Sequence, residues 1–162
     1  MGANLGRLDR SLEGFDHPAA YRGHQWELVR AGLHREKVSL IDDPARRSLV
    51  SWAFDLWDAV AGELPGLPWQ VIHGDANTEN ILVRDGRVSG FVDFGDACFN
   101  PRICELAIAL AYLMMGRDDP VEAAASSVAS YAGEVDLSGD ELAVLFPLVC
   151  GRLAVTVSMA TA

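Results

Sequence analysis

The stretch Val71–Val83, VIHGDANTENILV, decides how this sequence is interpreted. Both of its ends are apolar, as short strands are, and its middle is polar. Asp75 and Asn80 stand five positions apart between the two strand-like ends. Acidic and amide residues favour turns, but their side-chain oxygens also bind hard cations. The stretch therefore predicts either a plain polar turn or a loop that holds a ligand.

Strand-like patterns lie on both sides of this loop. Residues 69–73, WQVIH, are expected to form a short strand. Residues 79–95, ENILVRDGRVSGFVDFG, contain two more strand-like runs, separated by Asp85 and Gly86. An Asp-Gly pair between two such runs is a strong indication of a tight hairpin. The sequence therefore predicts a small β region around the polar loop.

The hairpin also predicts a cluster of oxygen ligands. Pairing of its strands should place Asn80, at the start, beside Asp93, at the end, with Asp75 nearby on the preceding loop. Mg²⁺ prefers one or two carboxylates and leaves its other positions to water and phosphate oxygens. A nearby acid that does not bind the metal is free to accept a proton. These are the groups that phosphoryl transfer requires.

Helical patterns surround the β region, two before it and three after it, without an internal repeat or a linker. The expected helices span residues 16–33, 42–64, 101–116, 119–133 and 138–160. The apolar face of the second is expected to contain Leu49, Ala53, Leu56, Val60 and Leu64. The fold class is therefore α+β, with mainly helical structure and a small β insert.

Composition limits the classes of function. The chain has 162 residues, 50% of them hydrophobic, which suits a single globular domain with a sizeable core. Its formal net charge of -10 disfavours nucleic acid as a partner, because phosphate backbones are repelled. The same charge suits a cationic small molecule, although solubility alone also explains it.

Cysteine usage and hydropathy bear on the compartment. Cys98, Cys104 and Cys150 are odd in number and form no C-x-x-C pair, which favours a reducing environment. The first residues lack the apolar core of a signal peptide. The apolar segment near the end of the chain is interrupted by Pro147 and Arg152. We therefore expect no membrane partner and a cytoplasmic location.

The motif HGDANTEN followed by VDFGD resembles the catalytic and metal-binding loops of aminoglycoside phosphotransferase-type small-molecule kinases. These enzymes are distant relatives of protein kinases, whose loops follow the patterns H-R-D-x-x-x-x-N and D-F-G. The wider stretches LGRLDRSLEGFDHPAAYR and DFGDACFNPRICELAIALAYLMM resemble the hydroxylysine kinase-like branch. The resemblance covers most of the chain. It implies a protein kinase-like fold, with ATP and Mg²⁺ as cofactors.

The resemblance also implies a role for each residue of the two loops. Asp75 would be the catalytic base that orients the acceptor hydroxyl and takes its proton. His73 would belong to the same catalytic group as a supporting residue that fixes the loop. Asn80 and Asp93 would bind Mg²⁺ and hold it against the ATP phosphates. Gly74 stands where many protein kinases have Arg, so we expect no switch that depends on a phosphorylated activation loop.

Two further acids have less definite roles. Asp96, three residues after the metal-binding acid, is expected on the acceptor side, where it could contact a substrate amine. Glu105 occupies the family's acidic position in the helix after the metal loop. Its expected role is structural, accepting backbone hydrogen bonds, and substrate contact is a minor alternative.

The nucleotide-binding half of such a kinase has no counterpart in this sequence. No G-x-G-x-x-G occurs, and Lys37, the only lysine, follows a helix rather than lying in a strand. Residues 1–162 are therefore expected to form one C-terminal lobe, as a fragment, a split gene product or a degraded copy. Alone it should show little or no ATP turnover. A preceding lobe or a fused domain, for example of aminotransferase type, would be a partner.

The expected activity is transfer of the ATP γ-phosphate to a hydroxyl of a small amine-bearing metabolite. A hydroxylysine-like acceptor is the first choice, and an aminoglycoside-like acceptor is the second. One alternative is a metal-dependent phosphoesterase with His73, Asp75, Asp93 and Asp96 around two metal ions. Another is a non-catalytic lobe that binds a partner through an exposed apolar patch.

Overall fold

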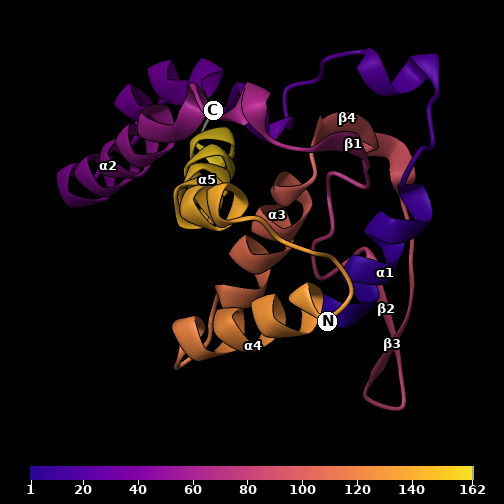
Figure 1. The fold of residues 1–162 in the computed structure, drawn as a ribbon. Helices are drawn as coiled ribbons and strands as arrows, with labels where there is room; N and C mark the ends of the chain where they lie inside the picture. The colour runs from indigo at the N-terminus through magenta and orange to yellow at the C-terminus, as the bar shows by residue number, and fades with distance from the viewer. Residues whose placement is uncertain (162) are drawn as a thin grey trace.

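Helices make up most of the fold (Figure 1), which the computed structural model describes for residues 1–161. The α-helices are α1 (Gly2–Leu12), α2 (Pro44–Ala61), α3 (Ile103–Met114), α4 (Pro120–Ala132) and α5 (Gly139–Ala160). The 3₁₀ helices are η1 (Pro18–Tyr21), η2 (Leu28–Leu40), η3 (Leu64–Gly66) and η4 (Phe94–Asp96). The strands are β1 (Trp69–Ile72), β2 (Ile81–Arg84), β3 (Arg87–Phe91) and β4 (Cys98–Pro101). The expected α+β class, mainly helical with a small β portion, is confirmed.

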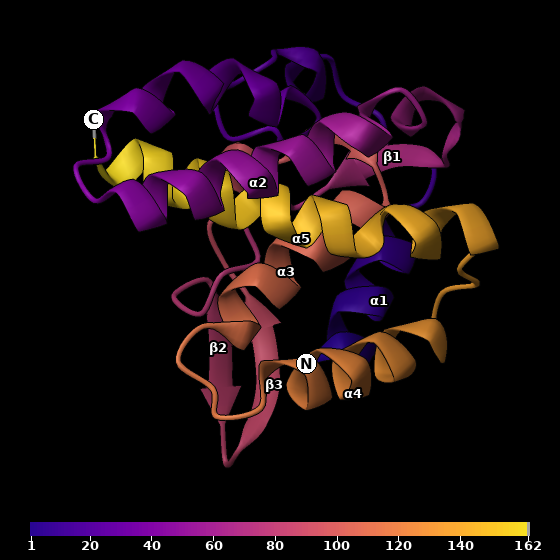
Figure 2. The same ribbon diagram turned by 90° about the vertical axis from the view of Figure 1, so that its left-hand side faces the viewer.

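The core is centred on α5, which packs against α2, η2 and α3 (Figure 2). α3 is buried on nearly every face from Ile103 to Ala111, as its continuous apolar sequence predicts. α1 and α4 lie side by side on the opposite side of α5 from α2. The hairpin of β2 and β3 projects away from the helices.

The strands form two antiparallel pairs. β2 pairs with β3, and the expected hairpin turn is present at Asp85 and Gly86. Both turn residues have positive φ, 51° and 71°, which is the conformation that a tight hairpin of this kind requires. The second pair joins β1 to β4, with Ile72 opposite Cys98. β4 was not among the expected strands.

These two pairs determine where the polar loops lie. Residues 73–80 connect β1 to β2 and residues 92–97 connect β3 to β4; they are called the catalytic loop and the metal loop after the roles that the resemblance implies. Because β1 pairs with β4 and β2 pairs with β3, the strands that flank one loop are hydrogen-bonded to the strands that flank the other. The loops must therefore run beside each other, as the clustering of their polar residues requires.

The helix expected over residues 16–33 is wrong. The chain there forms η1, then an irregular turn, and then η2. Side chains in the turn bind backbone N–H groups that a helix would need. Glu27 accepts from the N–H of His24, and His24 Nδ1 accepts from the N–H of Trp26. Such local side-chain bonds compete directly with helical hydrogen bonds.

Two other expectations about helices need correction. Of the residues expected on the inward face of the second helix, Ala53 and Leu64 are buried, and Leu56 and Val60 pack against the core. Leu49 is 62% exposed instead, and Val50, Phe54 and Trp57 of α2 are also buried. Phe54 and Trp57 are the largest side chains of this buried face, whereas Trp52 on the same helix is 49% exposed. α1 was missed; its buried face combines Leu5 with two glycines, Gly2 and Gly6, and a buried acid, Asp9.

α5 is long and apolar enough, by length and composition alone, to cross a membrane. Within this fold 56% of its most apolar window is buried against other helices, and the window includes a buried arginine, Arg152. The helix begins at a capping box in which the Ser138 and Glu141 side chains bind each other's backbone N–H groups. Its packing is that of a core helix.

Candidate active site

Asp75 lies in the catalytic loop with its carboxylate held from two sides. Its Oδ1 accepts a hydrogen bond of 2.9 Å from Nη2 of Arg152 in α5. Its Oδ2 accepts from the side-chain amides of Asn77 and Asn80, each at 2.9 Å. A carboxylate has about four acceptor positions, so one on Oδ1 stays free for a further donor. The side chain is 21% exposed, which leaves that position within reach of an acceptor hydroxyl.

The surroundings of Asp75 act on its protonation in opposite directions. Burial raises the pKa of the Asp75 carboxyl, and the nearby Asp96 raises it further. The Arg152 guanidinium lowers that pKa, as does the hydrogen bond from Asn77. Burial outweighs the donors, so the pKa of the Asp75 carboxyl is raised overall, while the donors favour the charged carboxylate, the form that can accept a proton.

Asn80 and Asp93 occupy facing positions on the two loops. The backbone N–H of Val92 donates to the carbonyl of Asn80 at 3.0 Å, so the expected proximity of Asn80 to Asp93 is confirmed. The Asn80 amide nitrogen donates to both the carbonyl and the carboxylate of Asp75. Asp93 has the left-handed conformation, φ 61°, and its Oδ1 accepts from the N–H of Gly95.

The remaining oxygens of this pair suit a hard cation. Within residues 1–161, no hydrogen bond uses Oδ1 of Asn80 or Oδ2 of Asp93. An amide oxygen and a carboxylate oxygen are ligands that Mg²⁺ accepts. The donor set therefore fits a magnesium ion, and its binding by Asn80 and Asp93 stays a prediction.

The His73 side chain links the catalytic loop to the metal loop. Its Nδ1 accepts from the N–H of Asp75 at 3.3 Å, and its Nε2 lies 2.9 Å from the carbonyl of Val92. The ring also packs against Phe94, with centroids 4.6 Å apart. Because His73 is fully buried and both of its nitrogens are bonded, it touches no reactant. His73 is therefore a positioning residue, which agrees with the supporting role in fixing the loop that was expected of it.

Glu105 supports the catalytic loop from α3. Its Oε2 accepts from the N–H of Gly74 at 3.0 Å. Burial raises the pKa of the Glu105 carboxyl, and the hydrogen bond from Gly74 lowers it. The side chain has no exposed surface, so the minor expectation of substrate contact is wrong. Gly74 itself has φ +79°, and a Cβ there would lie 2.6 Å from the carbonyl oxygen of Asp96.

Asp96 lies on the more open side of the metal loop, with its side chain 35% exposed. Its carboxylate is 3.6 Å from the Arg22 guanidinium and 3.9 Å from Nδ1 of His24. Arg22 also donates to the carbonyl of Gly95. A substrate amine that approached Asp96 would compete with Arg22, and the contact stays a prediction.

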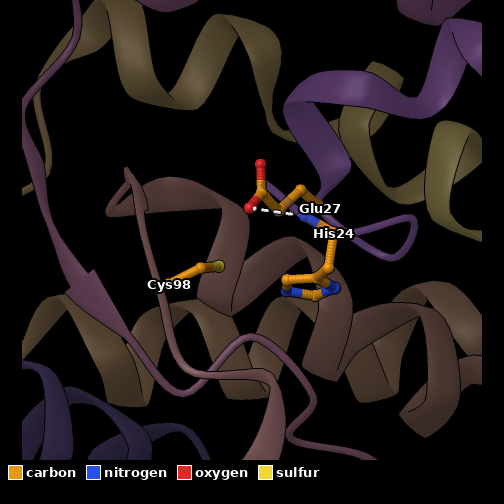
Figure 3. A group of neighbouring side chains, drawn as sticks. All are labelled: His24, Glu27 and Cys98. Atoms are coloured by element: carbon orange, nitrogen blue, oxygen red, sulfur yellow. Dashed lines mark hydrogen bonds between the residues drawn. The ribbon is translucent and has the colours of Figure 1, made fainter. Parts of the chain in front are cut away.

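His24, Glu27 and Cys98 face one another beside this loop (Figure 3), with potential ligand atoms within 4.8 Å. Both ring nitrogens of His24 already bond to the backbone, at Trp26 and at Asp96. Burial raises the pKa of the Cys98 thiol to about 12, which opposes the thiolate that a metal would need. His24 and Glu27 are already engaged in hydrogen bonds, and Cys98 is buried. The packing role expected for Cys98 is confirmed.

Sequence reasoning missed two residues that hold Asp75. Arg152 is 2% exposed and also donates to the carbonyl of Trp26 and the hydroxyl of Tyr112, each at 3.1 Å. A charged residue inside an apolar helix must have a buried partner, and this signal was available. Asn77 was the other residue. Its Oδ1 accepts from the backbone N–H groups of Glu79 and Asn80, a turn pattern that asparagine favours.

Comparisons with known proteins agree with this geometry. The model of the phosphotransferase enzyme family matches residues 1–138. Hydroxylysine kinase of Mus musculus is 28% identical over 174 residues, which cover 99% of this chain and 46% of the relative. Homoserine kinase of Neisseria meningitidis is 35% identical over 79 residues, covering 48% of this chain and 26% of the relative. The chain spans about half the length of the hydroxylysine kinases that it matches.

A solved structure shows the same fold. The aminoglycoside-3'-phosphotransferase of type VIII aligns with 93% of this chain and 59% of its own, at a TM-score of 0.52 and 23% identity. At that identity the similarity concerns the fold, and it confirms the protein kinase-like class. The family match extends through both loops and the buried helix between Ile103 and Met114. On this evidence the chain belongs to the phosphotransferase enzyme family.

Proposed function

We propose that this chain carries the catalytic loops of an ATP-dependent kinase that phosphorylates a hydroxyl of a small amine-bearing metabolite. The observation that supports this most strongly is the arrangement around Asp75. Three donors fix its carboxylate and leave one acceptor position free. The unused oxygens of Asn80 and Asp93 lie on adjoining turns of the two loops.

The reaction follows from these positions. The acceptor oxygen forms a bond to the γ-phosphorus of ATP, the bond from that phosphorus to the β-phosphate oxygen breaks, and ADP leaves. Asp75 orients the hydroxyl and takes its proton at Oδ1. Asn80 and Asp93 would bind Mg²⁺, which neutralises charge on the ATP phosphates. A base of this kind contributes about 10²–10⁴ in rate, and positioning supplies much of the remainder.

Hydroxylysine is our first candidate for the acceptor. The names of two relatives, hydroxylysine kinase and homoserine kinase, both specify amino acids that bear a hydroxyl and an amine. The net charge of -10 and the partly exposed Asp96 favour a cationic acceptor. An aminoglycoside is the second candidate, and it is supported by the similarity of fold.

The phosphoesterase alternative has little support in the structure. It needs His73 as a metal ligand, but His73 is fully buried and bonds through both nitrogens. The non-catalytic alternative draws on exposed apolar side chains on the metal loop and β2, where Phe94 is 47% and Leu82 is 48% exposed. A second kinase lobe would cover the same surface, so an activity measurement must distinguish the kinase from the non-catalytic lobe.

The test uses protein produced from the full coding sequence, with ATP, Mg²⁺ and one acceptor at a time. The acceptors are 5-hydroxylysine, homoserine and kanamycin, and phosphorylated product is identified by mass spectrometry. Lysine is the matched control because it lacks only the hydroxyl of hydroxylysine. We expect phosphohydroxylysine and no product from lysine. Absence of product from every hydroxylated acceptor, or release of phosphate from esters without ATP, would overturn the proposal.

A further inference from the structure

Arg152 brings a positive charge from the core helix α5 to the carboxylate of Asp75. Its Nη2 is 2.9 Å from Oδ1 of Asp75, and the arginine side chain is only 2% exposed. Among residues 1–161, Asp75 is the one acid that forms an ion pair with it. The contact joins residues 77 positions apart in the chain, so it depends on the packing of α5.

The guanidinium of Arg152 is itself held on several sides. Nη1 donates to the carbonyl of Trp26, and Nη2 donates to the hydroxyl of Tyr112 in α3. The rings of Trp26 and Tyr112 lie 5.3 and 5.4 Å from its central carbon, within the range of cation–π attraction. Contacts from two other segments therefore fix the donor that faces Asp75.

Burial of Arg152 is not explained by stability alone. Its Nε is buried and has no hydrogen-bond partner among the described residues, which costs free energy. Well-packed apolar residues in place of a buried ion pair often leave a fold as stable or more stable. The position of the charge therefore indicates a role at Asp75.

The geometry around Asp75 suggests what that role is. Asn77 and Asn80 both donate to Oδ2, so they hold one side of the carboxylate. Arg152 alone holds Oδ1, the oxygen with a free acceptor position. Without it, the carboxylate could rotate about its Cβ–Cγ bond and turn that position away from an acceptor hydroxyl.

We propose that Arg152 is a positioning residue for the catalytic base, aligning Oδ1 of Asp75 with the acceptor hydroxyl. This inference rests on the proposed kinase function. It predicts that loss of Arg152 lowers kcat and leaves the KM values for ATP and acceptor nearly unchanged, because the arginine touches neither reactant. A displacement of about 1 Å can cost about 10² in rate, so kcat of Arg152→Ala should fall by about 100-fold.

The experiment compares Arg152→Ala and Arg152→Lys with a matched control, Arg102→Ala, in protein from the full coding sequence. Arg102 also pairs with a carboxylate of α5, that of Glu141 at 2.9 Å, but it has no contact with Asp75. Kinetics with ATP and 5-hydroxylysine are measured with and without added guanidinium ion. Thermal unfolding of each variant reports its folded fraction.

We expect guanidinium to restore kcat of Arg152→Ala in a saturable manner, since the ion can enter the space that the side chain vacates. Arg152→Lys, which retains the charge but not the planar set of guanidinium donors, should lose about 10-fold in kcat. Arg102→Ala should lose stability and keep the kcat of its folded fraction, without response to guanidinium. If Arg152→Ala does not fold, the same KM and kcat analysis is made on Arg152→Lys.

Three outcomes would contradict the inference. Wild-type kcat in the folded fraction of both Arg152 variants would make the residue merely structural. A rise confined to the KM of the acceptor would make it a substrate-binding residue instead. Absence of phosphotransfer by the wild-type protein would overturn the proposed function itself, and the inference with it.

Discussion

Replacement of Gly74 by alanine tests how closely the two loops approach. Gly74 has φ +79°, where an L-residue costs about 1–2 kcal/mol more than glycine. Its new Cβ would also lie 2.6 Å from the carbonyl oxygen of Asp96. An ordinary van der Waals contact begins at 3.4 Å, so the loops must separate by about 0.8 Å. Crowding of this kind typically adds about 1–3 kcal/mol.

Gly86, in the hairpin turn, provides a matched control. Its φ is +71°, and a Cβ there would meet nothing within 4 Å. Gly86→Ala therefore has the backbone cost without the collision. For a chain of this size, each 1 kcal/mol lowers Tm by about 2–4 °C. We expect Gly74→Ala to lower Tm by at least twice as much as Gly86→Ala, as measured by calorimetry.

The same pair separates stability from activity. Separation of the loops moves Asp75 relative to Asp93, so Gly74→Ala should also reduce kcat by about 10²-fold. Gly86→Ala lies at the far end of the hairpin and should leave kcat of the folded protein unchanged. Equal losses of Tm in the two variants would refute the close approach of the catalytic and metal loops.

Two further predictions concern buried acids. Burial raises the pKa of the Asp9 carboxyl well above its usual value, and Tyr131 donates a hydrogen bond to it. The neutral acid favours the fold below the unfolded pKa of about 3.9, and this contribution is lost as pH rises through the folded pKa. Asp9→Asn should therefore raise Tm relative to wild type by an amount that grows above about pH 4, and a difference independent of pH would contradict this. Glu141 is buried and accepts hydrogen bonds from Nη2 and Nε of Arg102. Glu141→Gln should therefore lower the free energy of unfolding, measured in urea, by about 3–5 kcal/mol. Adding Arg102→Met should recover part of that loss, and strictly additive losses would contradict the pairing.

The active-site loops were largely predictable from sequence because their chemistry is local. The turn at Asp85 and Gly86 needs residues that tolerate positive φ, and the sequence supplies both. Once that hairpin is known, Asn80 and Asp93 must be neighbours. Gly74 and Asp75 follow from the catalytic-loop pattern alone.

Contacts between distant segments were not predictable in the same way. β4 has the sequence CFNP, which lacks alternation and ends in proline, and it becomes a strand only by pairing with β1. Arg152 is separated from Asp75 by 77 positions, so its target depends on how α5 packs. The sequence did show an unpartnered charge in an apolar helix, which predicts a buried partner without naming it.

The predicted helices were wrong where contacts of individual side chains had more effect than hydrophobic periodicity. His24 and Glu27 bind the backbone and end any helix across residues 16–33. In α2, the inward face is shifted from the expected one so that Phe54 and Trp57 are buried, whereas Leu49 and Trp52 are exposed.

We propose that Asp75 takes the acceptor's proton while Asn80 and Asp93 hold the metal. The most direct measurement compares turnover and Mg²⁺-dependent ATP binding in Asp75→Asn and Asp93→Asn, in protein from the full coding sequence. We predict that Asp75→Asn abolishes phosphorylation of the acceptor and retains most ATP binding. Asp93→Asn should weaken the Mg²⁺-dependent part of binding. Near-normal turnover of folded Asp75→Asn would contradict the assignment of Asp75 as the base.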